Sequence, residues 1–190
     1  MKREVARKVI HLSGLSIPLV CLQLDKVALI VLSITCLIIS AALEYVRLRH
    51  SELFPLKSAF RYLARNNELS SPSGYLYFFL GVSLSVILFE PIVAATALAA
   101  SILGDAFSAP AGLYFKRFRR GGEGRALEGS LMGALAILIL LLVRSFPPPW
   151  VIVASATFVI IDFLKPRQID DNLLFPLTIS VVIYLYTLFS

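Results

Sequence analysis

The chain has 190 residues, of which 58% are hydrophobic, and its mean hydropathy is +0.83. An average soluble domain is about 45–50% apolar, so this composition excludes an ordinary soluble protein and indicates one membrane domain over residues 1–190. The net charge is +6, but no soluble module is present to bind nucleic acid. Cys21 and Cys36 lie in apolar runs, so we expect neither a disulfide nor a metal site from them.

Apolar runs recur along the chain at about the length that a helix needs to cross a hydrocarbon core of about 30 Å. We predict transmembrane helices at 9–24, 27–46, 74–89, 91–112, 129–144, 149–164 and 173–189. Between the second and third spans, residues 51–66 alternate apolar and basic side chains at helical spacing. This segment predicts a short interfacial helix that serves as a connector or guards a lateral entry for a lipid.

The basic residues fix the predicted orientation. If the N-terminus is cytoplasmic, every lysine and arginine except Lys26 and Arg144 lies on the cytoplasmic side of a seven-span chain, as the positive-inside rule requires. A six-span model would put one basic loop on the wrong side. The predicted fold class is therefore an all-α polytopic membrane helix bundle of about seven transmembrane helices, with the N-terminus cytoplasmic and the C-terminus outside. It is surrounded by membrane lipids, in the plasma membrane of a prokaryote or the endoplasmic reticulum of a eukaryote.

Acidic residues gather at the predicted cytoplasmic ends of the spans, where a bundle could bring Asp105, Glu128, Asp171 and Asn172 to one shallow cavity. Each also has a structural explanation. Residues 170–172 could cap the last span, Glu128 could be a first-turn charge, and Asp105 could pair with an arginine of loop 113–127. Carboxylates suit Mg²⁺, and the cations and glycines of that loop suit a polyphosphate. No Walker A, kinase glycine loop or HExxH motif occurs.

The strings GDAFSAPAGLYFKR, GRALEGS and IDDNLLFP occur in this order, after an N-terminal RKVIH and the segment NELSSPSGYLYFFLG. Together they resemble the CTP-dependent lipid-alcohol kinase family, which includes dolichol kinase, phytol and farnesol kinases and the fungal CTP-dependent diacylglycerol kinase. The resemblance implies transfer of the γ-phosphate of CTP to a lipid hydroxyl at the cytoplasmic face, with Mg²⁺.

The resemblance also implies roles for particular residues. It makes Asp105, Glu128 and Asp171 catalytic and assigns Mg²⁺ to Asp105, Asp170 and Asp171. The residues expected to bind the nucleotide or shape its site are Gly112, Lys116, Arg117, Arg125, Gly129 and Asn172, with Arg7, Lys8 and His11 from the first span. Two positions depart from the family pattern, because Lys116 replaces a glycine and Arg125 replaces a lysine.

Other functions stay open from the sequence. A CDP-lipid synthase also binds CTP and a lipid, and a non-catalytic lipid transporter or binding subunit is a third possibility. The acceptor could be a polyprenol or dolichol, phytol, geranylgeraniol or diacylglycerol. The pair Gly129 and Gly133 fits helix packing within the chain as well as a dimer, so no oligomeric state is predicted.

Overall fold

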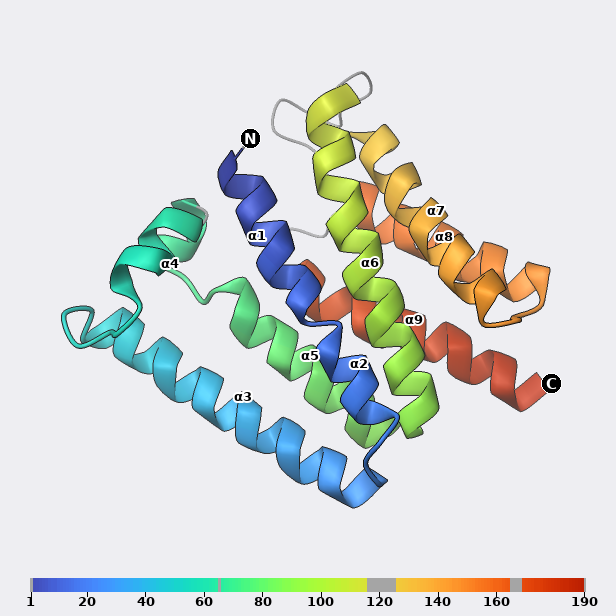
Figure 1. Cartoon of the computed structure of the whole chain (residues 1–190), viewed down its shortest axis with the longest axis horizontal. Coiled ribbons are helices and arrows are strands. Elements are labelled where there is room, and N and C mark those ends of the chain that lie inside the picture. The colour runs from blue at the N-terminus through green and yellow to red at the C-terminus, as the bar shows by residue number, and fades with distance from the viewer. Residues whose placement is uncertain (1, 65, 116–125, 165–168, 190) are drawn as a thin grey trace.

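The computed structural model describes residues 2–64, 66–115, 126–164 and 169–189, and every regular element in these ranges is a helix (Figure 1). The elements are α1 (Lys2–Ser13), α2 (Ser16–Cys21), α3 (Lys26–Arg49), α4 (Lys57–Leu63), the 3₁₀ helix η1 (Asn66–Leu69), α5 (Gly74–Leu88), α6 (Pro91–Phe115), α7 (Leu127–Val143), α8 (Pro148–Leu164) and α9 (Asp171–Phe189). The all-helical prediction is confirmed for this part of the chain.

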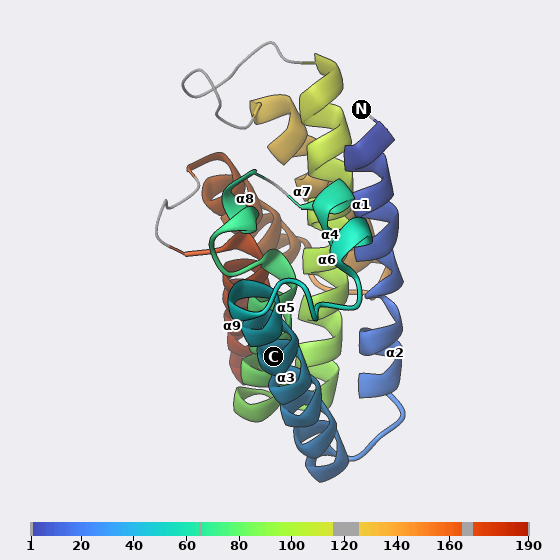
Figure 2. The same cartoon turned by 90° about the vertical axis from the view of Figure 1, so that its left-hand side faces the viewer.

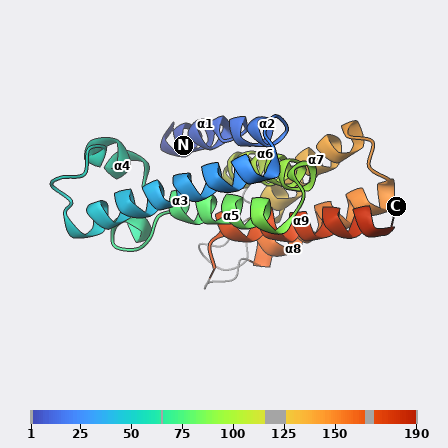
Figure 3. The same cartoon turned by 90° about the horizontal axis from the view of Figure 1, so that it is seen from below.

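Helix α6 is the centre of the molecule, because it packs against α1 and α2 on one side and against α7 and α9 on the other. Its buried positions are mostly small, and Ala94, Ala97 and Ala100 are fully buried. Small side chains let neighbouring helices approach closely. The helices α1 and α2 lie along one face of the molecule, with α8 and α9 along the opposite face (Figure 3).

Glycines set the crossing of α6 and α7. A Cβ atom on Gly129 would lie 2.5 Å from the carbonyl oxygen of Ser108, and one on Gly133 would lie 2.5 Å from that of Gly104. Neither distance is sterically possible, so both positions require glycine if the backbones are to stay this close. The Gly129-x-x-x-Gly133 pattern is thus used for packing within the chain.

The first predicted span, 9–24, is not one helix. The chain instead forms α1 and α2, which are separated at Gly14 and Leu15. Two residues explain the break. Pro18 has no N–H to donate to the carbonyl of Gly14, and glycine itself weakens a helix interior. The α1 helix also begins earlier than predicted, at Lys2, so the basic N-terminal residues are helical.

Residues 51–66 also differ from the single helix that the sequence predicts. The helix α4 begins only at Lys57, and η1 follows at Asn66. Pro55 explains the late start, because a proline disfavours the helical conformation in the residue before it. The segment folds back beside α1, as Figure 2 shows.

Three described helices are long and apolar enough to cross a membrane: α3, the segment Pro91–Gly112 of α6, and α9. The apolar helices α5, α7 and α8 are shorter, with 15 to 17 residues. Their bounds agree with the predicted apolar runs to within two residues, because prolines, glycines and charges mark the ends of these runs in the sequence.

Candidate functional site

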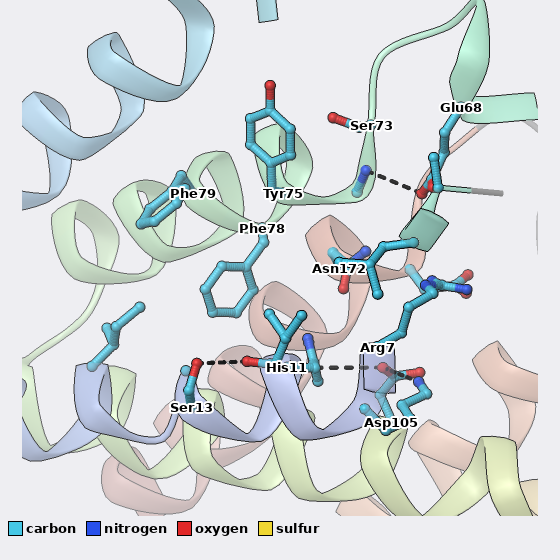
Figure 4. Close-up of a pocket in the computed structure, with 18 of the residues that line it drawn as sticks. Arg7, His11, Ser13, Glu68, Ser73, Tyr75, Phe78, Phe79, Asp105 and Asn172 are labelled. Atoms are coloured by element: carbon cyan, nitrogen blue, oxygen red, sulfur yellow. Dashed lines mark hydrogen bonds and ion pairs between the residues drawn. The ribbon is translucent and has the colours of Figure 1, made fainter. Parts of the chain in front are cut away.

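A cavity of about 600 Å³ lies between α1, α4, α5, α6 and the first turn of α9. Its polar lining includes Arg7, Lys8, His11, Glu68, Ser73, Tyr75, Asp105, Asp171 and Asn172. In Figure 4, His11 and Asp105 lie side by side, Asn172 lies across the cavity from them, and the Tyr75 ring points away from them. Six of the predicted site residues therefore meet at one place, although they come from three distant parts of the sequence.

Asp105 lies on α6 at the base of this cavity and is 8% exposed. Its Oδ2 atom lies 2.5 Å from Nζ of Lys8 and 3.4 Å from Nε2 of His11. Lys8 and His11 are three residues apart on α1, so they share the face that packs against α6. The first span thus supplies partners for Asp105, whereas residues 116–125, where we expected a partner arginine, lie outside the described residues.

The start of α9 presents Asp171 and Asn172 to the cavity. Oδ1 of Asp170 accepts hydrogen bonds from the backbone N–H of Asn172 at 2.9 Å and from its Nδ2 at 2.8 Å. Asp170 therefore caps the helix and fixes the Asn172 amide, and it does not line the cavity in the part of the chain described here. Gly74 allows α5 to come close, because a Cβ atom there would lie 2.8 Å from Nδ2 of Asn172.

The remaining predicted residues lie elsewhere or are not described. Within the described ranges, Gly112, Glu128 and Gly129 are at the crossing of α6 and α7 rather than on the cavity wall. Glu128 is in the first turn of α7 and is half-buried. Lys116, Arg117 and Arg125 lie outside the described residues.

A buried cluster around Glu44 and Arg47 was not predicted as part of the site. The guanidinium of Arg47 donates from Nε to Oε2 of Glu44 at 2.8 Å and from Nη2 to Oε1 at 2.6 Å. Glu44 also accepts from the backbone N–H and hydroxyl of Ser73 and from the hydroxyl of Tyr75. Glu44 is 3% and Arg47 6% exposed, so the pair is withdrawn from solvent.

Arg47 ties this cluster to the cavity wall. It donates to the backbone carbonyls of Glu68 and Ser71, each at 2.8 Å, and lies 4.5 Å from the centre of the Phe60 ring. Glu68 and Ser73 line the cavity. The sequence signal was a Glu and an Arg one turn apart at the end of an apolar helix, but their partners in residues 60–75 are not local.

A second buried carboxylate, Asp162 of α8, is 1% exposed and accepts a hydrogen bond from the hydroxyl of Ser130 at 2.7 Å. Ser130 follows Glu128 and Gly129 in the first turn of α7. This contact fixes the start of α7 against α8, and it is made by the last residue of the GRALEGS string.

The donor chemistry of the cavity fits Mg²⁺ held jointly with a triphosphate. Among the described residues, no group of three or more histidine, cysteine or acidic side chains is arranged to hold a metal ion. Two carboxylates, Asp105 and Asp171, do line one cavity together with the Asn172 amide. Mg²⁺ is usually bound by one or two carboxylates plus substrate phosphates, so the residue types of this smaller oxygen set are compatible with Mg²⁺.

Comparison with known proteins gives no match to a family model, to a curated protein or to a solved structure. The function is therefore argued from the cavity and from the sequence motifs that meet there.

Proposed function

We propose that the protein is a membrane-embedded kinase that transfers the γ-phosphate of CTP to the hydroxyl group of a lipid alcohol. The observation that carries this proposal is the cavity, where Asp105, Asp171 and Asn172 meet Lys8 and His11. These residues come from three of the strings that resemble the lipid-alcohol kinases. A cavity that combines acidic and basic groups with apolar walls suits a substrate pair made of a triphosphate and a lipid.

The proposed topology has seven spans, with the N-terminus cytoplasmic and the C-terminus outside. The α1–α2 pair forms the first span and α3 and α5 to α9 form the others. Three long apolar helices, the shorter apolar helices and the basic segments between alternate spans support this arrangement. The end of α6 and the start of α1 lie at the same end of the bundle (Figures 1 and 2). The proposed topology requires this, because it puts the basic segments next to both on the cytoplasmic side.

Phosphoryl transfer depends mainly on positioning the reactants and neutralising charge, because the protein has little covalent chemistry to perform. Arg7 and Lys8 provide positive charge at the cavity for the triphosphate. Asp171 would hold Mg²⁺, which would supply further charge neutralisation at the phosphate oxygens and leave Asp105 to the acceptor. The Asn172 amide, fixed by Asp170, is placed to hydrogen-bond a phosphate or the acceptor hydroxyl.

In the proposed reaction, Asp105 accepts the proton of the lipid hydroxyl. The hydroxyl oxygen forms a bond to the γ-phosphorus, and the bond from that phosphorus to the β–γ bridging oxygen breaks. The products are a lipid phosphate and CDP, and the proton is left on the Asp105 carboxyl group. Lys8, whose Nζ atom lies 2.5 Å from Oδ2 of Asp105, orients this carboxylate before the reaction.

The test is an assay of purified protein in lipid nanodiscs with CTP labelled at the γ-phosphate, Mg²⁺ and a mixture of lipid alcohols. We expect label in the extracted lipid, and we expect Asp105→Asn to reduce its rate by at least about 100-fold, as for loss of a general base. The matched control is Glu52→Gln, because Glu52 is an exposed carboxylate outside the cavity. Size-exclusion elution checks that both variants are folded.

The labelled atom separates the alternatives. If γ-label stays out of the lipid while α-labelled CTP transfers its CMP group, the protein is a CDP-lipid synthase. If neither label moves with folded protein, the kinase proposal is wrong and lipid binding or transport becomes the function to test.

A further inference from the structure

A second, smaller cavity of about 100 Å³ adjoins the first between α2, α3 and α5. Its walls are apolar side chains from all three helices, among them Val20, Leu29, Val82 and Val86. The polar cavity and this apolar cavity share the lining residues Ser16, Ile17, Cys36 and Phe79. The two therefore meet at one boundary, with charged groups on one side and hydrocarbon on the other.

Helix packing explains why the space exists. The short α2 helix packs against α6, whereas α3 packs against α5, and α2 and α3 have little contact with each other in the described chain. Leu32 of α3 lines the apolar cavity and is 42% exposed, so this wall lies at the surface of the bundle. In the proposed topology that surface faces lipid, and the apolar cavity opens sideways between α2 and α3.

We propose that this cavity is the binding channel for the hydrocarbon chain of the acceptor and that it accepts one chain, as in an isoprenoid alcohol. The inference rests on the proposed function. With the hydroxyl at Asp105, the chain passes Ile17, Cys36 and Phe79 and lies between α2 and α3. A cavity of about 100 Å³ walled by three helices takes only the first few carbons of one chain, and the rest of the chain extends into the lipid. A diacylglycerol, whose two chains start from one glycerol, fits this space poorly.

The two cysteines of the protein provide a binding assay that needs no catalytic turnover. Cys36 is half-buried at the boundary of the two cavities, whereas Cys21, the other cysteine, is 2% exposed. Protein in phosphatidylcholine nanodiscs is treated with a membrane-permeable maleimide, and modification of the Cys36 peptide is followed by mass spectrometry. We expect geranylgeraniol, without CTP, to slow this modification by at least about fivefold. A smaller effect does not count as binding of the lipid in the cavity.

Two comparisons make the assay specific. Dioleoylglycerol at the same mole fraction should leave the Cys36 rate within twofold. A cysteine introduced by Ile152→Cys on α8, where the native side chain is 62% exposed, should be modified at the same rate with and without either lipid. Equal protection by both lipids overturns the single-chain assignment, and unchanged Cys36 modification with geranylgeraniol overturns the channel.

A substitution tests the same channel by activity. Leu32→Trp fills the apolar cavity from α3, and Leu32 does not line the polar cavity. This variant should therefore abolish phosphorylation of geranylgeraniol and keep that of a short alcohol such as isopentenol. Normal phosphorylation of geranylgeraniol by this variant overturns the channel. Failure of the two proposals is distinguishable, because protection of Cys36 without kinase activity refutes only the kinase reaction. Kinase activity without protection refutes only the channel.

Discussion

The buried pair of Glu44 and Arg47 gives the sharpest prediction about stability. Replacing Arg47 by methionine keeps much of the apolar stem that packs near Phe60 but removes every hydrogen bond of the guanidinium. Glu44, at 3% exposure, would then lose the cation that compensates its burial. Removal of one partner of a buried ion pair costs about 3–5 kcal/mol, because the other charge remains buried without compensation.

This free energy translates into a measurable change of melting temperature. A chain of this size shifts by about 2–4 °C for each kcal/mol, so Arg47→Met should lower Tm by about 6–20 °C. Thermal unfolding in detergent, followed by size-exclusion elution, measures the change. The Tm of Arg47→Lys should lie between those of Arg47→Met and the native protein. One ammonium group cannot reach both oxygens of Glu44 and the carbonyls of Glu68 and Ser71 together.

The matched control is Arg49→Met, two residues further along α3, where the side chain is exposed. It should change Tm by no more than about 1–2 °C, since an exposed substitution usually costs less than about 0.5 kcal/mol. Equal melting temperatures for the Arg47 and Arg49 variants would refute the reasoning. Such a result would mean that the Glu44–Arg47 cluster does not hold residues 66–73 against α3.

Two further predictions separate a role in helix packing or capping from a role in binding. Gly133→Ala should lower stability by about 1–3 kcal/mol, because the new methyl group would lie 2.5 Å from a backbone oxygen, whereas Gly112→Ala, with its nearest contact at 3.7 Å, should leave Tm unchanged or raised. If Gly112→Ala keeps Tm but loses activity, that glycine contacts the nucleotide. Asp170→Ala should reduce stability by about 1 kcal/mol through loss of the cap on α9. A shift in the Mg²⁺ concentration needed for activity, with Tm unchanged, would instead identify Asp170 as a metal ligand.

Hydropathy predicted most helices well, and the reason is visible in their ends. The α6 helix begins at Pro91 and α5 at Gly74, close to the predicted positions, because these residues interrupt the apolar runs. Hydropathy failed in the first run, which is apolar from residue 9 to 24 but folds as two helices. Composition records how apolar a segment is, whereas the break depends on the missing backbone donor at Pro18 and on the glycine at position 14.

The site was predicted in its motifs but not in its contacts. Asp105, Asp171 and Asn172 stand in distinctive strings, so the sequence could nominate them. Lys8 was predicted to shape the nucleotide site from the first span, and only the packing of α1 on α6 makes it the partner of Asp105. The contacts of Arg47 could not be predicted from the sequence for the same reason, since two of its acceptors are backbone carbonyls more than 20 residues away in the chain.

The contrast between Glu44 and Asp105 shows how two buried carboxylates at the ends of helices differ in chemical capacity. Glu44 accepts five hydrogen bonds from Arg47, Ser73 and Tyr75, and a carboxylate offers about four lone-pair sites, so both of its oxygens are saturated. Such a group holds structure and is unsuited to take up a proton. Asp105 lines the cavity and contacts Lys8 and His11, whose side chains come from a different helix and can themselves bind a phosphate. In the proposed reaction, an incoming triphosphate would compete with Asp105 for these cations, and the carboxylate would then accept the proton of the acceptor hydroxyl.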